Sequence, residues 1–497
     1  MIFISERGDI NETKEKNQIM DGDYLERILD DSWKCIAIDT PQHISDNILN
    51  GFQGIETTNF GELGYNYAIT TPDFERDLIL GFSPDMASPN SRYTEIFGLG
   101  DGWGLKIPFL EQVNGQWILH EDRGLEYPAQ YQEETDTFEI LHYPSEYTFS
   151  RQDEDTYLLE KGYGEQISFA VDGRVLQTTD ALGNITVYEY DKAGQLSRMI
   201  FSDGTEVRWD RTSDEMILTY LKPDAQTEVL AVFVLARTAD GRSILTEIRS
   251  EFAENMVFQY ESSAIQGNLR LESAEIQDNV VYTFYYEESQ PVENGTLNRI
   301  AEIQIDREDG ILSRRQYTYG ADGRIAELDT GSLTISYSYD INTDGTLTVQ
   351  TCKESSESID ILEDVYNDKG QLIYYETNDA TVSLEYNQKN KISKMIENGV
   401  QTKYTYSKNG LLDTANQDGL VTKYSYYDDG TRRTVQTNTE VIYYNQDGSI
   451  QEVKQNKDTF PTKNSDFTRD RLMQSNDSLE PLRPRSDNID LSRIITE

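Results

Sequence analysis

Among the residue types that carry out catalysis, histidine is scarce in this chain. Histidine, a common general base and metal ligand, occurs only as His43, His120 and His142. His120 is followed directly by Glu121 and Asp122, which suggests a metal site or an acid–base pair. Successive strand residues point to opposite faces, however, so adjacent ligands rarely converge. Neither a His-Glu-x-x-His helix nor a Gly-x-Ser-x-Gly elbow occurs. We therefore expect no catalytic residue and no metal ligand.

The best candidate for a metal site is a calcium-like loop. Asp340, Asn342 and Asp344 place oxygen atoms at alternate positions, and Gly345 follows them. Thr351 stands at the twelfth position, where a calcium loop needs a bidentate glutamate, and no flanking helices are expected. We interpret the segment as a lengthened hairpin turn, with calcium as the alternative. No cofactor is expected elsewhere.

The carboxylates and glycines of the sequence do not identify a catalytic or phosphate-binding site. The chain has 89 Asp and Glu residues, so a glycosidase-like pair can be neither selected nor excluded by counting. Residues 97–108 contain glycine at alternate positions, but their order is not that of a phosphate-binding loop. We interpret this stretch as a bend in which Trp103 is buried beneath a closely approaching backbone.

The elements that would position any site are defined by residues 183–196. Alternation predicts a strand with Tyr188 and Tyr190 on one face. Asp191 can accept hydrogen bonds from its own turn, and Gly194 accepts a positive φ. Leu196 then restarts the apolar pattern. The stretch therefore predicts one strand, a tight turn and the start of a second strand.

The same unit recurs along the chain. Tyr366, Tyr386, Tyr406 and Tyr426 are spaced 20 residues apart, which indicates a repeat architecture made of strand pairs. The residues expected to define these copies, with a structural role only, are Tyr317, Tyr319, Gly323, Tyr337, Tyr339, Tyr366, Gly370, Tyr404, Tyr406, Gly410, Tyr424 and Tyr426.

Composition narrows the possible partners. A net charge of −45 disfavours nucleic-acid binding, because such a surface repels phosphates. No apolar run is long enough for a transmembrane helix, and the first residues do not read as a signal peptide. The two cysteines, Cys35 and Cys352, are expected to be free thiols, although a disulfide between them stays open.

The pattern Tyr-x-Tyr-Asp-x-x-Gly-x-Leu, preceded by Gly183-Asn184, resembles the YD repeat of the RHS proteins. Members of that family include C components of bacterial toxin complexes, wall-associated proteins and teneurins. The resemblance covers roughly residues 90–455. It implies a sheet wound into a hollow shell, and an exported or cell-surface role or a cytoplasmic stage before export. The chain contains no Asp-Pro dipeptide, so the self-cleavage and toxin parts of such proteins are not carried over.

We therefore predict an all-β fold, a long spiralling antiparallel sheet that forms a partial shell. Four regions are predicted. Residues 1–54 do not match the repeat and contain a short helix at 23–31. They are followed by a glycine- and aromatic-rich β region at 55–165, the repeat region at 166–456 and a disordered or loosely attached tail at 457–497. The predicted function is a non-catalytic shell or scaffold that encloses or presents another polypeptide, and the resemblance implies a setting in toxin delivery or competition between bacteria. The alternatives are a cell-surface module that binds glycans or proteins through exposed tyrosines, and a carboxylate-pair hydrolase. Self-association through sheet edges is a further possibility.

Overall fold

The computed structural model describes residues 55–57, 61, 63–72, 77–82, 92–105, 107–113, 115–121, 126–223, 227–262, 269–276, 280–287, 299–306, 313–356, 358–378, 380–446 and 448–455. In this part of the chain nearly all regular structure is β, which confirms the predicted fold class. None of the described helices has the length and apolarity needed to cross a membrane. The predicted helix at 23–31, the tail at 457–497 and Cys35 lie outside the described residues.

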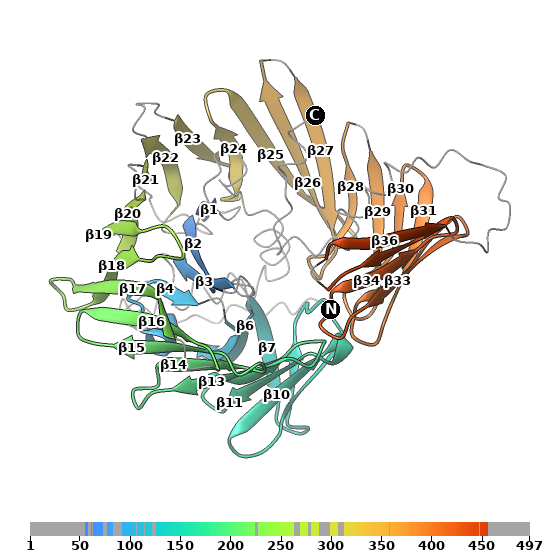
Figure 1. Cartoon of the computed structure of the whole chain (residues 1–497). Helices are drawn as coiled ribbons and strands as arrows, with labels where there is room; N and C mark the ends of the chain where they lie inside the picture. Colours follow the sequence, from blue (N-terminus) through green and yellow to red (C-terminus); the bar gives the residue numbers. More distant parts are fainter. Residues whose placement is uncertain are drawn as a thin grey trace.

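Most strands belong to one antiparallel sheet of 32 strands, which we call the wall. Each wall strand pairs with its neighbours in sequence, and the strand order closes into a ring (Figure 1). The wall strands are β5 (Phe109–Val113), β6 (Gln116–His120), β7 (Glu126–Gln132), β8 (Thr137–Ile140), β9 (Tyr147–Arg151), β10 (Thr156–Lys161), β11 (Gln166–Ala170), β12 (Val175–Thr179), β13 (Ile185–Tyr190), β14 (Leu196–Phe201), β15 (Glu206–Arg211), β16 (Glu215–Leu221), β17 (Thr227–Arg237), β18 (Ser243–Arg249), β19 (Met256–Ser262), β20 (Leu269–Ile276), β21 (Val280–Tyr286), β22 (Ile300–Asp306), β23 (Ser313–Tyr319), β24 (Ile325–Asp329), β25 (Leu333–Ile341), β26 (Leu347–Ser355), β27 (Ile359–Tyr366), β28 (Leu372–Glu376), β29 (Thr381–Tyr386), β30 (Ile392–Glu397), β31 (Val400–Tyr406), β32 (Leu412–Gln417), β33 (Leu420–Tyr426), β34 (Arg432–Gln436), β35 (Glu440–Tyr444) and β36 (Ile450–Gln455).

A second, four-stranded sheet lies within the ring (Figure 1). It consists of β1 (Ile55–Thr57), β2 (Leu63–Thr70), β3 (Asp77–Phe82) and β4 (Trp103–Leu105), and we call it the inner sheet. The short helix α3 (Arg92–Phe97) precedes β4 and packs beside it. The sequence did not predict this second layer, because its strands were expected to open the main sheet.

The apolar core lies between the inner sheet and the concave face of the wall. One large cluster of buried side chains joins β2–β4 and α3 to wall strands from β5 to β25. Trp103, at the start of β4, is fully buried in it, as expected for the glycine-rich bend. The later wall strands carry two smaller apolar clusters, one around Leu384 and one around Val435. The first part of the wall is therefore two layers thick.

Alternation along each repeat strand decides which side chains face inward. In β13, Tyr188 is buried while Glu189 is exposed. The pairing of β13 with β14 shifts register at Tyr190, which is a β-bulge. The same shift recurs at Tyr319, Tyr386 and Tyr406. Because a bulge increases the local twist of a strand, its regular recurrence suits a sheet that curves into a ring.

Candidate functional site

The repeated tyrosine forms a hydrogen bond that joins successive hairpins. Its hydroxyl donates to a backbone carbonyl near the start of the preceding strand, 14 or 15 residues earlier in seven copies. The O···O distances in these copies run from 2.5 to 3.1 Å, and we call the contact the tyrosine bridge. The seven donor–acceptor pairs are Tyr190 with Val175, Tyr260 with Leu245, Tyr286 with Leu271, Tyr339 with Ile325, Tyr386 with Leu372, Tyr406 with Ile392, and Tyr426 with Leu412.

Tyr319 makes the same kind of bond to Ile300 across a longer spacing. Burial raises the pKa of Tyr190, Tyr386 and Tyr406 well above the ordinary value, so these hydroxyls stay protonated and able to donate. Each bridge satisfies a polar group on a half-buried tyrosine and connects one hairpin to the previous one. The bridged tyrosines thus contribute to the cohesion of the wall.

The turn of the repeat is held by its own side chain. Asp191 Oδ1 accepts hydrogen bonds from the backbone N–H groups of Ala193 and Gln195, at 2.8 and 2.9 Å. Gly194 has a φ of +87°, and its N–H donates to the Asp191 carbonyl. Asn367, Asn387 and Ser407 cap the later turns in the same way, so a short oxygen acceptor is what this position requires.

The other residues predicted to define the repeat lie on the inward face or in turns. Leu196, Tyr317, Tyr366 and Tyr424 are buried. Tyr337 stacks on Tyr339, with ring centroids 6.5 Å apart. Tyr404 is half-buried and packs against both later apolar clusters. Positive φ angles occur at Gly323, Gly370 and Gly410.

Sequence reasoning missed an arginine that covers the bridging tyrosine in part of the wall. The residue just before the accepting carbonyl places its guanidinium over the tyrosine ring. Arg174 lies 4.8 Å from the Tyr190 centroid, and Arg270 lies 4.3 Å from that of Tyr286. Arg299 and Arg324 do the same for Tyr319 and Tyr339. The signal is present in the recurring Asp-Gly-Arg sequences at 172–174 and 322–324.

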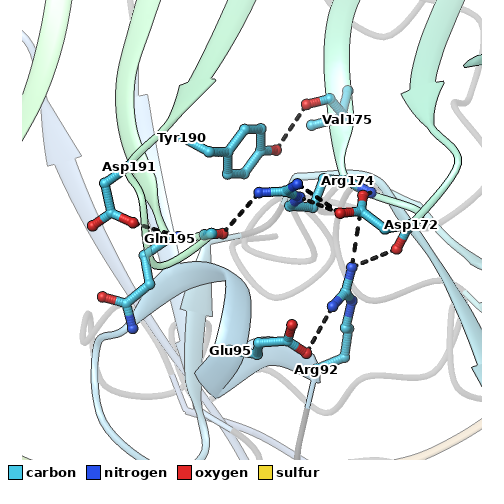
Figure 2. Close-up of polar contacts among 9 residues, drawn as sticks. Arg92, Glu95, Asp172, Arg174, Val175, Tyr190, Asp191 and Gln195 are labelled. Atoms are coloured by element: carbon cyan, nitrogen blue, oxygen red, sulfur yellow. Dashed lines mark hydrogen bonds and ion pairs between the residues drawn. The ribbon is translucent and has the colours of Figure 1, made fainter. Parts of the chain in front are cut away.

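A chain of charged contacts connects the tyrosine bridge of Tyr190 to helix α3 (Figure 2). Arg174 Nη2 lies 2.6 Å from Asp172 Oδ2, and its Nη1 donates to the Gly194 carbonyl. On α3, Arg92 donates to the Asp172 carbonyl and pairs with Glu95 at 2.7 Å. Burial alone would raise the pKa of Asp172, but bonds from Arg174 and the charge of Arg92 hold it below the ordinary value. One repeat turn is thus tied to the inner layer.

A second connection joins the start of β4 to the β17–β18 hairpin and to β19. The Asp101 N–H donates to the Ser243 carbonyl at 2.8 Å, and the Trp103 indole N–H donates to the Tyr260 hydroxyl at 2.8 Å. The backbone of Leu245 passes so close to Gly100 that a Cβ there would lie 2.8 Å from the Leu245 nitrogen. This close approach explains the glycine requirement of the bend.

The Asp101 carboxyl itself is buried, with 3% of the residue exposed. Its Oδ2 lies 3.9 Å from Arg242 Nε, while Asp240 takes the same nitrogen at 2.8 Å. Burial raises the pKa of Asp101 to about 6, partly offset by the charge of Arg242. A carboxyl group with a raised pKa next to a second carboxylate is a feature that a hydrolase would need. Here the Asp101 carboxyl is buried at the contact between the inner sheet and the wall.

The residues first considered for chemistry do not assemble. His120 bonds Glu111 Oε2 at 3.0 Å and stacks on Phe109. Glu121, its neighbour, instead pairs with Lys161 at 2.5 Å. Asp122 and His43 lie outside the described residues. The described part of the chain holds no group of three or more His, Cys, Asp or Glu placed to bind a metal ion.

In the calcium-like loop, Asp344 Oδ1 accepts bonds from the N–H and hydroxyl of Thr346, at 3.0 and 2.7 Å. Asn342 donates to the hydroxyls of Thr346 and Thr348. These contacts are those of a capped hairpin turn. Cys352 is a half-buried free thiol in β26.

His142 lines an open groove of about 1090 Å³ together with residues of later turns, among them Asp368, Lys369 and Asn387. Burial lowers the pKa of His142, although the charge and carbonyl of Asp368 act in the opposite direction. The groove therefore lies between parts of the wall that are far apart in sequence.

Comparison with protein families matches residues 171–206 to the RHS repeat. This stretch of the chain is similar to an RHS repeat. The match spans β12–β14 and the start of β15, including the tyrosine bridge of Tyr190 and the turn capped by Asp191. It confirms the resemblance drawn from residues 183–196, and the RHS repeat is a structural repeat family. No curated protein matches the chain.

Proposed function

We propose that this RHS-repeat chain is a structural shell whose wall encloses another polypeptide segment against its concave face. The observation that carries the proposal is the ring of repeat strands with its tyrosine and apolar face turned inward. The inner sheet already occupies this face along the first part of the wall, where one large cluster of buried apolar side chains joins the two layers. The wall therefore works as a container for β-structured or extended chain.

The later repeats offer a similar surface for a second occupant. Tyr375, Met395 and Tyr404 are partly buried on the inner face and flank the smaller apolar clusters. On the same strands, outward positions hold charged side chains such as Glu385 and Lys394, which pair with each other. An apolar inner face behind a charged outer face suits an enclosed polypeptide with exposed apolar side chains.

Binding of an unfolded probe tests the proposal. The probe is fluorescently labelled, reduced and carboxymethylated lactalbumin, an acidic polypeptide that the acidic wall would not attract by charge. Tyr404→Ser should weaken binding about 10- to 100-fold, because burying one large apolar side chain is worth roughly 1.5–3 kcal/mol and about 1.4 kcal/mol is tenfold in affinity. Lys403→Ser is the matched control, since Lys403 neighbours Tyr404 in β31 and is exposed.

The wild-type chain and the control should also protect the bound probe from protease. The proposal fails if the probe does not bind, or if the inner and outer substitutions weaken binding equally. A folded globular probe, intact disulfide-bonded lactalbumin, should bind much more weakly in either case.

The glycan-binding alternative finds less support. It requires a line of exposed aromatic rings, whereas the repeat tyrosines face inward. Among the described residues, Tyr285 is the one aromatic residue that is largely exposed, with 46% of its surface accessible to solvent.

A further inference from the structure

The two distant parts of the wall meet along a line of hairpin turns, which we call the seam. On one side are the turns at 141–146, 162–164 and 180–183. On the other are the turns at 367–371, 387–391, 407–411 and 427–431. The Glu146 N–H donates to the Gln388 carbonyl at 2.5 Å. Leu182 packs closely on Gly430, because a Cβ on Gly430 would lie 2.8 Å from Leu182 Cδ1.

Tyr163 makes more contacts across this seam than its own turn requires. Its hydroxyl accepts a hydrogen bond from Asn387 Nδ2 at 2.9 Å, between residues 224 apart in sequence. The Lys389 ammonium lies 4.8 Å from its ring centroid, and the Tyr406 ring lies 6.2 Å away. Gly410 abuts the same ring, because a Cβ on Gly410 would lie 3.0 Å from Tyr163 Cγ.

The backbone of Tyr163 is strained. Its φ and ψ are 70° and 14°, in the left-handed region, which costs roughly 1–2 kcal/mol for a residue with a Cβ. The flanking Gly162 and Gly164 could hold such a turn without a large aromatic residue between them. Strain at a residue whose contacts are all remote indicates a role in those contacts rather than in the turn.

The seam also differs from the rest of the wall in how it is joined. Neighbouring strands such as β25 and β26 are linked by a continuous ladder over nine residue pairs. The seam contacts named above comprise one backbone hydrogen bond, one side-chain hydrogen bond, one cation–π contact and side-chain packing. Parting two ladder strands requires local unfolding, whereas parting the seam requires only that these turn contacts separate.

We propose that Tyr163 is a latch that holds the wall closed at the seam, and that the wall opens along this line while its strand ladders stay intact. The opening is a property of the wall itself and holds whatever the shell contains. It would give access to the concave face without unfolding any repeat.

Amide hydrogen exchange of the full chain tests this latch. Tyr163→Asn is the decisive variant, because asparagine tolerates a positive φ and so keeps the turn while removing the ring and its contacts. The Glu146 amide should exchange about tenfold faster in this variant, since loss of a hydrogen bond and of ring packing favours local opening. Amides in the β29–β30 ladder should be unchanged.

Tyr285→Asn on the outer face is the control and should leave the Glu146 amide unaffected. A purely local role for Tyr163 predicts unchanged or slower exchange in Tyr163→Asn, and that result would overturn the proposal. So would equal acceleration throughout the wall.

A double-mutant cycle gives a milder, independent measurement. Tyr163→Phe removes the hydroxyl, and Asn387→Ser removes the amide donor while keeping a turn-capping oxygen of the kind that Ser407 supplies. Their effects on exchange at Glu146 should be non-additive, and additive effects would argue against a direct latch.

Discussion

The buried carboxyl of Asp101 makes a prediction about stability that can be worked through from its surroundings. Asp101→Asn preserves the size of the side chain and removes a charge that burial disfavours. A pKa of about 6 in place of 3.8 corresponds to about 3 kcal/mol of folding free energy above pH 6, so the variant should be more stable by roughly 1–3 kcal/mol at pH 7.5. Arg242 keeps its closer partner, Asp240, so the substitution does not strand a buried arginine.

The sign of the pH dependence follows from the same values. Between pH 3.8 and about 6 the folded chain holds the Asp101 proton more tightly than the unfolded chain does. Stability from this group is therefore greatest below pH 3.8 and is lost as the pH rises through about 6. The difference in stability between Asp101→Asn and the wild type should grow over this window and then level off.

Two measurements check this prediction, namely urea unfolding between pH 4.5 and 8 and exchange of the Asp101 amide, which donates to Ser243. A gain of 3 kcal/mol would slow that exchange by roughly 100-fold. Asp240→Asn is the control, because hydrogen bonds from Thr238 and the charge of Arg242 lower the pKa of Asp240, so its contribution is lost as the pH falls. A variant no more stable than the wild type at pH 7.5, or a difference that does not vary with pH, would refute the reasoning.

Two further predictions concern the repeat itself. Gly194→Val should destabilise the chain by about 1–3 kcal/mol, because φ at this position is +87° and a β-branched residue is strained there; the thermal unfolding midpoint should fall, and an unchanged midpoint would contradict the turn assignment. Tyr406→Phe should cost about 1 kcal/mol through loss of the hydroxyl bond to the Ile392 carbonyl, whereas Tyr285→Phe, on the exposed outer face, should cost much less in the same urea titration.

The local features of the repeat could be predicted from sequence because short-range chemistry decides them. Asp191 and Gly194 determine the turn by themselves, and alternation places Tyr188 and Tyr190 on one face. The carbonyl that accepts the hydrogen bond of the tyrosine bridge could not be predicted from the local sequence, because it depends on which strand lies beside the tyrosine strand.

Contacts between residues far apart in the chain could not be predicted from the sequence. The strands of the inner sheet have ordinary alternation, and nothing in them shows that they fold inside the wall. The buried state of Asp101 depends on the approach of a hairpin more than 130 residues later. Tyr163 looks like any turn tyrosine until Asn387 and Gly410 are brought against it.

The regular spacing of the tyrosine bridge also bears on how such a chain can change in length. Tyr386, Tyr406 and Tyr426 donate to Leu372, Ile392 and Leu412, so donor and acceptor advance together by 20 residues. Excising or duplicating one such block leaves every remaining hydroxyl opposite an equivalent carbonyl. Evolution or an engineer can therefore alter the circumference of the ring in whole blocks, whereas a shift of a few residues inside a block would misplace its bridge.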